Sequence, residues 1–237
     1  PSMAARSIKF LALAIVLLVG CAVPHTVIEP DGGQIRVLGP APGFSPTTPP
    51  SSWVIEGTLD KPGRASVVNK DGVPALLFNS GSDSFLLARL TRAKLLATPY
   101  LSWAWNMGPH DGVTHPVSLV VGFRGGNLQG AGATTWGWPG TALPIHDRRV
   151  TIVWGAAALK RGSFDEYVRK TGHRYFQRGG RENTGSWWLE TADLADLYAR
   201  AWPQDDQGQV GIVFIGVAGQ PAETPAQAHV SGILLSR

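Results

Sequence analysis

The stretch that decides the fold is ALLFNSGSDSFLLARLTRAKLLATPYLSWAW, residues 75–105. It contains three short apolar segments, 75–78, 84–90 and 100–105, and turn-forming residues such as Asn79-Ser80-Gly81 separate them. Short apolar segments bounded by Gly, Asn, Ser or Pro are typical of β-strands. The stretch therefore predicts consecutive strands.

The same pattern extends over the rest of the chain, which has 237 residues and is 43% hydrophobic, enough for one sizeable core. Further strand-like segments lie at 66–68, 116–123, 150–154, 175–177, 186–190, 210–217 and 229–235. About ten strands without regularly spaced helices predict a mostly β protein, an antiparallel β-sandwich or jelly roll, and argue against a βαβ fold.

One or two short helices are also expected. Ser163 and Glu166 have capping-box spacing and predict a helical segment from 163 to 170. In residues 191–201, the apolar side chains recur at helical spacing, and Thr191 is a candidate N-cap.

The N-terminal region has the pattern of an export signal. The basic residues Arg6 and Lys9 precede an apolar run at 10–19, which is too short to span a membrane comfortably. The run ends in Leu18-Val19-Gly20-Cys21, which resembles the lipobox of bacterial lipoproteins. We therefore expect a signal peptide at 1–20 and lipid attached to Cys21. The alternative is an ordinary secretory signal with a cysteine at this place by chance.

Cys21 is the only cysteine, so the domain cannot contain an intramolecular disulfide. Ala22 follows it, and the absence of Asp at that position predicts an exported, membrane-anchored lipoprotein on the outer membrane, facing the periplasm. The proline-rich residues 21–52 predict a tether, although 26–28 and 34–38 are candidates for an edge strand. The β-sandwich domain is then expected at 53–237.

The charge gives no reason to expect a nucleic-acid partner. Without Arg6 and Lys9, 19 Lys and Arg residues stand against 17 Asp and Glu residues. An excess this small does not indicate binding to an acidic polymer.

The nine tryptophans suggest either a core or a ligand surface. Trp103 and Trp105 share one face of a strand, which favours core packing over an aromatic platform for sugars. Trp136 and Trp138 lie in a Gly- and Pro-rich segment, where an exposed binding loop and a loop packed over the sandwich edge remain open alternatives. Trp188 and Glu190 share a face and could stack on and hydrogen-bond to a sugar, or Glu190 is a solvated strand residue. The candidate ligand-binding residues are Trp105, Trp136, Trp138, Trp188 and Glu190.

No catalytic or metal motif is present in the sequence. The histidines lack His-x-His or His-Glu-x-x-His spacing, and no Gly-x-Ser-x-Gly motif occurs. Acidic residues such as Asp83, Asp111 and Glu190 are too scattered to pair as glycosidase carboxylates from sequence alone. We therefore expect no metal and no cofactor, and lean against an enzyme.

Three segments in order, 78–105, 150–155 and 175–202, resemble the domain-of-unknown-function family 3047. The resemblance implies an exported, mostly β domain without an established activity. Arg89, Trp105, Trp154, Trp188, Asp193, Tyr198 and Arg200 match the family pattern. Ala104, Leu197 and residues 218–224 depart from it, because relatives often carry polar or acidic residues there.

These patterns together predict a lipid-anchored cell-envelope β-sandwich that binds a glycan or another envelope ligand. Two alternatives are an envelope polysaccharide hydrolase and a structural or assembly lipoprotein that binds a protein partner.

Overall fold

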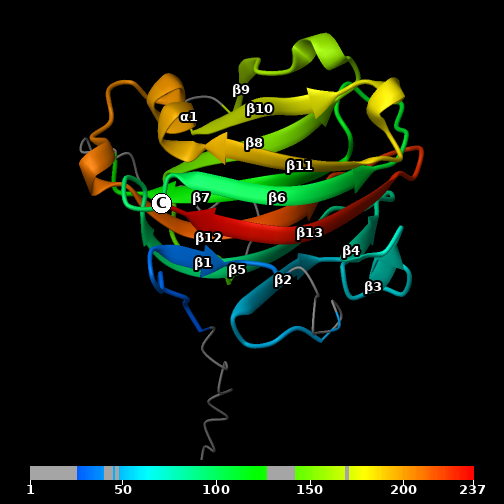
Figure 1. The fold of residues 1–237 in the computed structure, drawn as a ribbon, viewed down its shortest axis with the longest axis horizontal. Coiled ribbons are helices and arrows are strands. Elements are labelled where there is room, and N and C mark those ends of the chain that lie inside the picture. The colour runs from blue at the N-terminus through cyan, green and yellow to red at the C-terminus, as the bar shows by residue number, and fades with distance from the viewer. Residues whose placement is uncertain (1–25, 40–44, 46–47, 127–141, 169–170) are drawn as a thin grey trace, which may run out of the picture.

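Two β-sheets pack face to face in the computed structural model, which describes residues 26–39, 45, 48–126, 142–168 and 171–237 (Figure 1). In the six-stranded sheet, β1 pairs with β13 beside the main path. The order along that path is β11 (Trp187–Asp193), β6 (Tyr100–Met107), β13 (Gln227–Ser236), β4 (Val73–Asn79) and β3 (Ala65–Lys70), and β1 spans Gln34–Arg36.

The second sheet has seven strands. Their order is β2 (Trp53–Gly57), β5 (Phe85–Lys94), β12 (Gly211–Gly219), β7 (Val117–Arg124), β8 (Arg148–Gly155), β10 (Gly172–Gly179) and β9 (Phe164–Val168). The predicted β-sandwich is confirmed. The sheet is mixed, however, because β8 and β10 are parallel. The chain leaves β8, forms β9 at the edge of the sheet, and returns antiparallel to it as β10.

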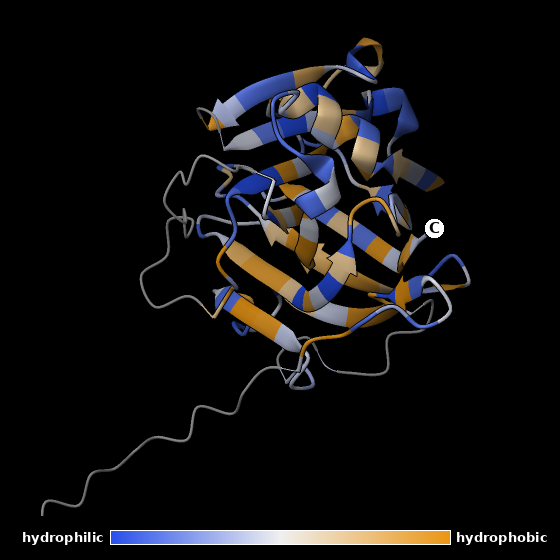
Figure 2. Ribbon diagram, turned by 90° about the vertical axis from the view of Figure 1, so that its left-hand side faces the viewer, coloured by the Kyte–Doolittle hydropathy of each residue, from blue (hydrophilic) through white to orange (hydrophobic). Residues whose placement is uncertain are grey.

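The core lies between the sheets and is built by period-two alternation, visible as alternating hydrophobic and hydrophilic bands on the strands (Figure 2). Trp103 and Trp105 of β6 both point inward and are 0% and 1% exposed. Their rings meet edge to face at 5.3 Å, and Trp105 meets Trp154 of the opposite sheet at 5.8 Å. The preference for core packing of this pair is confirmed.

Helix α1 (Leu194–Ala201) confirms the second predicted helix and buries Leu194, Leu197 and Tyr198. The predicted cap is wrong. Asp193 caps the helix by accepting from the backbone N–H groups of Ala195 and Asp196, both at 3.0 Å. Thr191 belongs to β11, where its hydroxyl bonds to that of Ser102 across the strands.

The helix expected at 163–170 is wrong, because Phe164–Val168 forms β9. Cross-strand contacts with β10 favour the extended conformation. Asp165 accepts two hydrogen bonds of 2.9 Å from Arg174, and Phe164 stacks on His173 at 5.1 Å. A local capping pattern does not outweigh an ion pair and a ring contact that form only between paired strands.

The end of α1 is tied to β8 by a buried polar network. Asp205 accepts hydrogen bonds from Arg148 Nε at 2.8 Å and Nη2 at 3.1 Å, and from the Tyr198 hydroxyl at 2.8 Å. Burial and the neighbouring carboxylate raise the pKa of Tyr198 well above its usual range, so this hydroxyl stays protonated and donates.

The N-terminal segment contributes to the core. Ile35, Val37 and Leu38 are at most 2% exposed, and Ile28 forms a bridge with Thr91. The expectation of an edge strand in residues 34–38 is confirmed by β1. Within the described part of the chain, no helix is long and apolar enough to cross a membrane.

The tryptophan core yields a stability prediction. We expect Trp105→Ala to lower the free energy of unfolding by about 3–5 kcal/mol, because it removes a fully buried ring and leaves a cavity. The control is Leu189→Ala, whose side chain on β11 is 80% exposed, with an expected change within about 0.5 kcal/mol. Urea unfolding measures both, and equal effects would contradict the proposed core.

Candidate functional site

The outer face of the seven-stranded sheet carries a groove of about 810 Å³. It crosses strands β5, β12, β7 and β8 and reaches β10 and β9, with connecting segments along its sides. A groove of this volume is in the range of small-molecule binding sites.

The strand register explains which side chains face the groove. Residues directly opposite each other on neighbouring strands point to the same face. Three such rows run across the sheet: Glu56, Leu86, Ala218 and Ser118; Val54, Ala88, Gly216, Val120, Thr151 and Arg174; and Leu90, Phe214, Gly122 and Arg149. Apart from Ser118, the rows are apolar over β5, β12 and β7, and the second and third rows become polar at β8 and β10.

The apolar half of this face is a second hydrophobic cluster, separate from the core between the sheets. Its buried members are Val54, Ala88, Leu90, Val120, Phe214 and Ala218. The Phe214 ring lies directly over Gly122, where a Cβ atom would come within 2.0 Å of the ring. Glycine at 122 therefore leaves room for the Phe214 ring, which is 1% exposed, to pack against the sheet.

The described segment 142–147 crosses this face from β2 to β8. The backbone N–H of Ala142 donates to Glu56 Oε1 at 2.8 Å, and Leu143 packs on the apolar cluster. The His146 ring then meets Phe214 edge to face at 5.0 Å. Burial lowers the pKa of His146, so its imidazole is neutral at pH 7.

The polar half of the groove centres on Arg149, which is 7% exposed. Arg149 Nη2 donates to the Tyr167 hydroxyl, which also lies 3.0 Å from the Thr151 hydroxyl. The Tyr167 ring lies 5.1 Å from the Arg149 guanidinium and 5.8 Å from that of Arg174. Burial lowers the pKa of Arg149 to about 9, which leaves the side chain positively charged at neutral pH.

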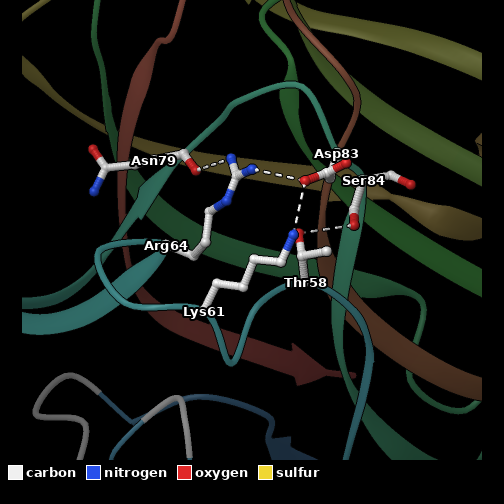
Figure 3. A network of polar contacts seen from close by, with 6 residues as sticks. All are labelled: Thr58, Lys61, Arg64, Asn79, Asp83 and Ser84. Carbon is white, nitrogen blue, oxygen red and sulfur yellow. Dashed lines mark hydrogen bonds and ion pairs between the residues drawn. The ribbon is translucent and has the colours of Figure 1, made fainter.

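A polar network holds the loop at one end of the groove, near Ser84 (Figure 3). Asp83 accepts from Lys61 at 3.1 Å and from Arg64 at 3.5 Å, and Arg64 also reaches the backbone carbonyl of Asn79. The Thr58 hydroxyl donates to the carbonyl of Ser84 at 3.4 Å. The carboxylate of Asp83 thus links the loop before Ser84 to Lys61 and Arg64.

His115 lines the same end of the groove as a neutral, hydrogen-bonded residue. Its Nδ1 accepts from the Val117 N–H at 3.0 Å, which leaves the proton on Nε2 to donate to the Gln227 carbonyl at 3.2 Å. Burial lowers the pKa of His115 to about 3. Its ring meets that of His110 at 5.3 Å, but no group of three metal-ligating side chains occurs among the described residues.

The candidate ligand-binding residues and the candidate lipidation residue Cys21 are not among the described residues that line the groove. Trp136, Trp138 and Cys21 lie outside the described residues. Trp105 is in the core. Trp188 and Glu190 lie on β11 at the sandwich edge and outside the groove lining.

Glu190 and Trp188 bind residues of β10 in the facing sheet. Glu190 is 3% exposed, and it accepts hydrogen bonds from Arg178 and, at 2.8 Å, from Gln177. Arg178 also stacks on the Trp188 ring at 3.7 Å. These contacts connect the two sheets. The described contacts of Glu190 therefore hold the fold together.

The sequence interpretation missed Arg149, Thr151 and Tyr167. A signal for the first two exists within β8, where Arg149 and Thr151 alternate with the buried residues Val150, Ile152 and Trp154. Polar residues at two-residue spacing in a strand mark its non-core face. Tyr167 carried no such signal, because its segment was predicted to be helical.

No family model matches the sequence, and no curated protein sequence matches it either. The resemblance to the domain-of-unknown-function family 3047 therefore stays a prediction.

Three solved structures are similar to this chain at low sequence identity. A family 12 xyloglucanase from Bacillus licheniformis is 9% identical with a TM-score of 0.43, over 86% of this chain and all of that one. The K2 cleaved adhesin domain of Lys-gingipain is 9% identical with a TM-score of 0.42, over 87% and 99%. A structure of carbohydrate-binding modules from the β-sandwich superfamily is 12% identical with a TM-score of 0.34, over 83% and 62%.

The pKa of His115 yields a prediction on acid stability. Between its unfolded value of 6.5 and its folded value of about 3, only the unfolded chain takes up a proton at this site. Its contribution to stability is therefore complete above pH 6.5 and is lost as pH falls towards 3, by up to about 1.4 kcal/mol per pH unit.

We expect the His115→Gln variant to lose about 2 kcal/mol less stability than the wild type between pH 7 and pH 4.5, because the amide does not titrate. Urea unfolding at the two pH values tests this. The other histidines and carboxylates are the same in both proteins, so their titration contributes equally to the two losses. An identical loss in the two proteins would show that His115 is not buried in its neutral form.

Proposed function

We propose that the chain is a cell-envelope binding protein that holds a glycan in the groove on the outer face of the seven-stranded sheet. The observation that carries the proposal is the division of this face into an apolar floor and a polar half. A sugar ring has apolar C–H faces and a rim of hydroxyl groups. Leu86, which is partly exposed beside the buried Val120 and Phe214, offers apolar surface for the former, and Thr151, Tyr167 and Arg149 line the polar half with hydrogen-bonding groups for the latter.

The rigidity of the site also favours binding. Its floor and its polar groups lie on paired strands, and the loop at Ser84 is held by the network around Asp83. Groups that are ordered before binding lose little conformational entropy when the ligand arrives.

The charged side chains favour binding over hydrolysis as the working hypothesis. A glycosidase uses two carboxyl groups about 5–9.5 Å apart. Among the described residues that line the groove, Glu56 is the one carboxylate, and it accepts the N–H of Ala142. The guanidinium, hydroxyl and imidazole groups are suited to hydrogen bonding with a glycan.

We also propose that Cys21 carries lipid and that the protein is exported to the outer membrane, where it faces the periplasm. The apolar run at 10–19 and the Leu18–Cys21 pattern support this proposal. Two or three acyl chains bind a bilayer firmly, since each buried CH₂ contributes about 0.8 kcal/mol.

A variant that blocks the groove tests whether the glycan binds there. Gln220 is exposed at its rim, so Gln220→Trp fills the groove with little cost to folding. We expect this variant to lose at least about tenfold in affinity for the glycans that the wild type binds on an array of envelope polysaccharides, a factor that corresponds to about 1.4 kcal/mol.

Gln204→Trp is the matched control, because Gln204 is exposed outside the groove lining, and we expect it to bind as the wild type does. Absence of glycan binding by the wild type, or release of cleaved products from a bound glycan, would overturn the proposed function.

The anchor is tested by mass spectrometry of the mature protein expressed with its N-terminal region in a bacterial host. We expect a chain that begins at Cys21 and carries the added mass of its acyl chains. The Cys21→Ala variant should leave the membrane fraction, because it cannot be acylated. An unmodified wild-type N-terminus elsewhere would contradict the proposal.

A further inference from the structure

We propose that a short spacer after Cys21 holds the sandwich upright on a phospholipid surface, with the β2–β5 edge towards the lipid and β9 and β10 away from it. The inference rests on the proposed acylation of Cys21. It does not depend on which ligand the groove takes.

The first argument is that the chain is attached to the domain from Thr26 onward. The backbone N–H of Thr26 donates to the Ser51 carbonyl at 3.1 Å, and that of Ile28 donates to the Leu90 carbonyl at 3.1 Å. The Arg92 N–H in turn donates to the Ile28 carbonyl at 2.8 Å. These bonds fix the segment along β5, beside the start of β2.

The second argument is the length of the spacer. Only residues 22–25 separate Cys21 from Thr26. A fully extended chain advances at most about 3.6 Å per residue, so the path from Cys21 to Thr26 spans at most roughly 18 Å. The acyl chains of Cys21 lie in the bilayer, and Thr26 therefore stays within about that distance of the lipid surface.

The third argument is the place of Thr26 in the fold. The strand order of the seven-stranded sheet puts β2 and β9 at opposite edges, and Figure 1 shows β2 and β5 at the bottom with β9 and β10 at the top. Six intervals of about 4.8 Å separate the two edges by roughly 29 Å. An anchor attached beside β2 and β5 therefore brings that edge to the lipid and leaves the β9 edge far from it.

The charge of the anchored edge is compatible with an anionic phospholipid surface. The segments 26–36, 48–53 and 90–94 meet at Thr26. Their charged residues are Arg36, Arg92 and Lys94 against Glu29 and Asp31, which leaves an excess of one positive charge. All five are exposed. Anionic headgroups attract such an edge.

This orientation leaves the groove accessible. The groove crosses the sheet from β5 to β9, so it runs outward from the anchored edge. Its lining residues on β9 and β10 lie at the end farthest from the lipid. A ligand can therefore reach the groove while the protein is bound to the membrane.

Fluorescent labels on the acylated full chain test this orientation. Cys21 is the only cysteine, and acylation blocks its thiol, so Val27→Cys and Leu159→Cys each provide one labelling site. Val27 is next to Thr26 and is 38% exposed. Leu159 is 99% exposed and lies in the short helix Ala158–Lys160, where Lys160 contacts Phe176 of β10. Exposed positions tolerate such substitutions with little cost to folding.

The labelled chains are reconstituted in vesicles of phosphatidylethanolamine and phosphatidylglycerol that carry a nitroxide quencher on their headgroups. We expect a loss of fluorescence for the label at position 27 and none for the label at position 159. The reason is that the spacer limits the first distance to roughly 18 Å, whereas the second includes most of the width of the sheet.

A longer spacer provides the control for the effect of its length. A flexible linker of about 20 Gly and Ser residues, inserted after Ala22, adds a mean span of roughly 25 Å and allows the domain to turn. We expect it to remove the difference between the two labels. The same linker added after Arg237 should leave the difference unchanged, because it does not lie between the anchor and the domain.

The possible failures are distinguishable, because the mass of each reconstituted chain reports its acylation. An unacylated chain would overturn this inference together with the proposed anchor. In an acylated chain, equal quenching at both positions, stronger quenching at position 159, or a difference that survives the linker after Ala22 would overturn the upright orientation. Those results would leave the anchor and the proposed glycan groove intact.

Discussion

The alternation of side chains along the paired strands of the seven-stranded sheet is the constraint on which the rest of the structure depends. On β8 it sends Val150, Ile152 and Trp154 into the core and leaves Arg149 and Thr151 on the outer face. A shift of register by one residue would exchange the two sets, burying a guanidinium among tryptophans and exposing Trp154. The stability of the core and the geometry of the groove are therefore consequences of one register.

This dependence divides the polar groups of the protein into two kinds. The networks of Asp205 with Arg148 and of Glu190 with Arg178 connect elements to one another, and each buried carboxylate is satisfied by a described partner. The groups around Arg149 also bond to one another, but they line the groove.

The sequence was sufficient to predict the sandwich because a strand signal is local. All ten apolar segments bounded by turn residues coincide with strands to within one residue at their starts, and the tryptophans of β6 share the inward face, as their two-residue spacing allows. The signal failed at β9, where Ser163 and Glu166 imitate a capping box, and at the parallel pairing of β8 with β10. Both depend on contacts between separate strands, which no short motif contains.

The site was harder to predict, because it depends on which strands become neighbours. Glu190 and Trp188 have the residue types of a sugar site, but β11 lies at the sandwich edge, where Arg178 and Gln177 occupy them. Arg149 and Tyr167 lie on strands that meet only through β10. Their proximity became visible only with the sheet order.

The central claim is that the ligand occupies the outer face of the seven-stranded sheet. Mapping of backbone amide NMR shifts on the labelled protein, during titration with a glycan that it binds, tests this claim most directly. The account predicts that the largest shifts fall on β7, β8, β9 and β12, around Val120, Thr151 and Tyr167. Shifts confined to β11 and its neighbours, around Trp188 and Glu190, would contradict it.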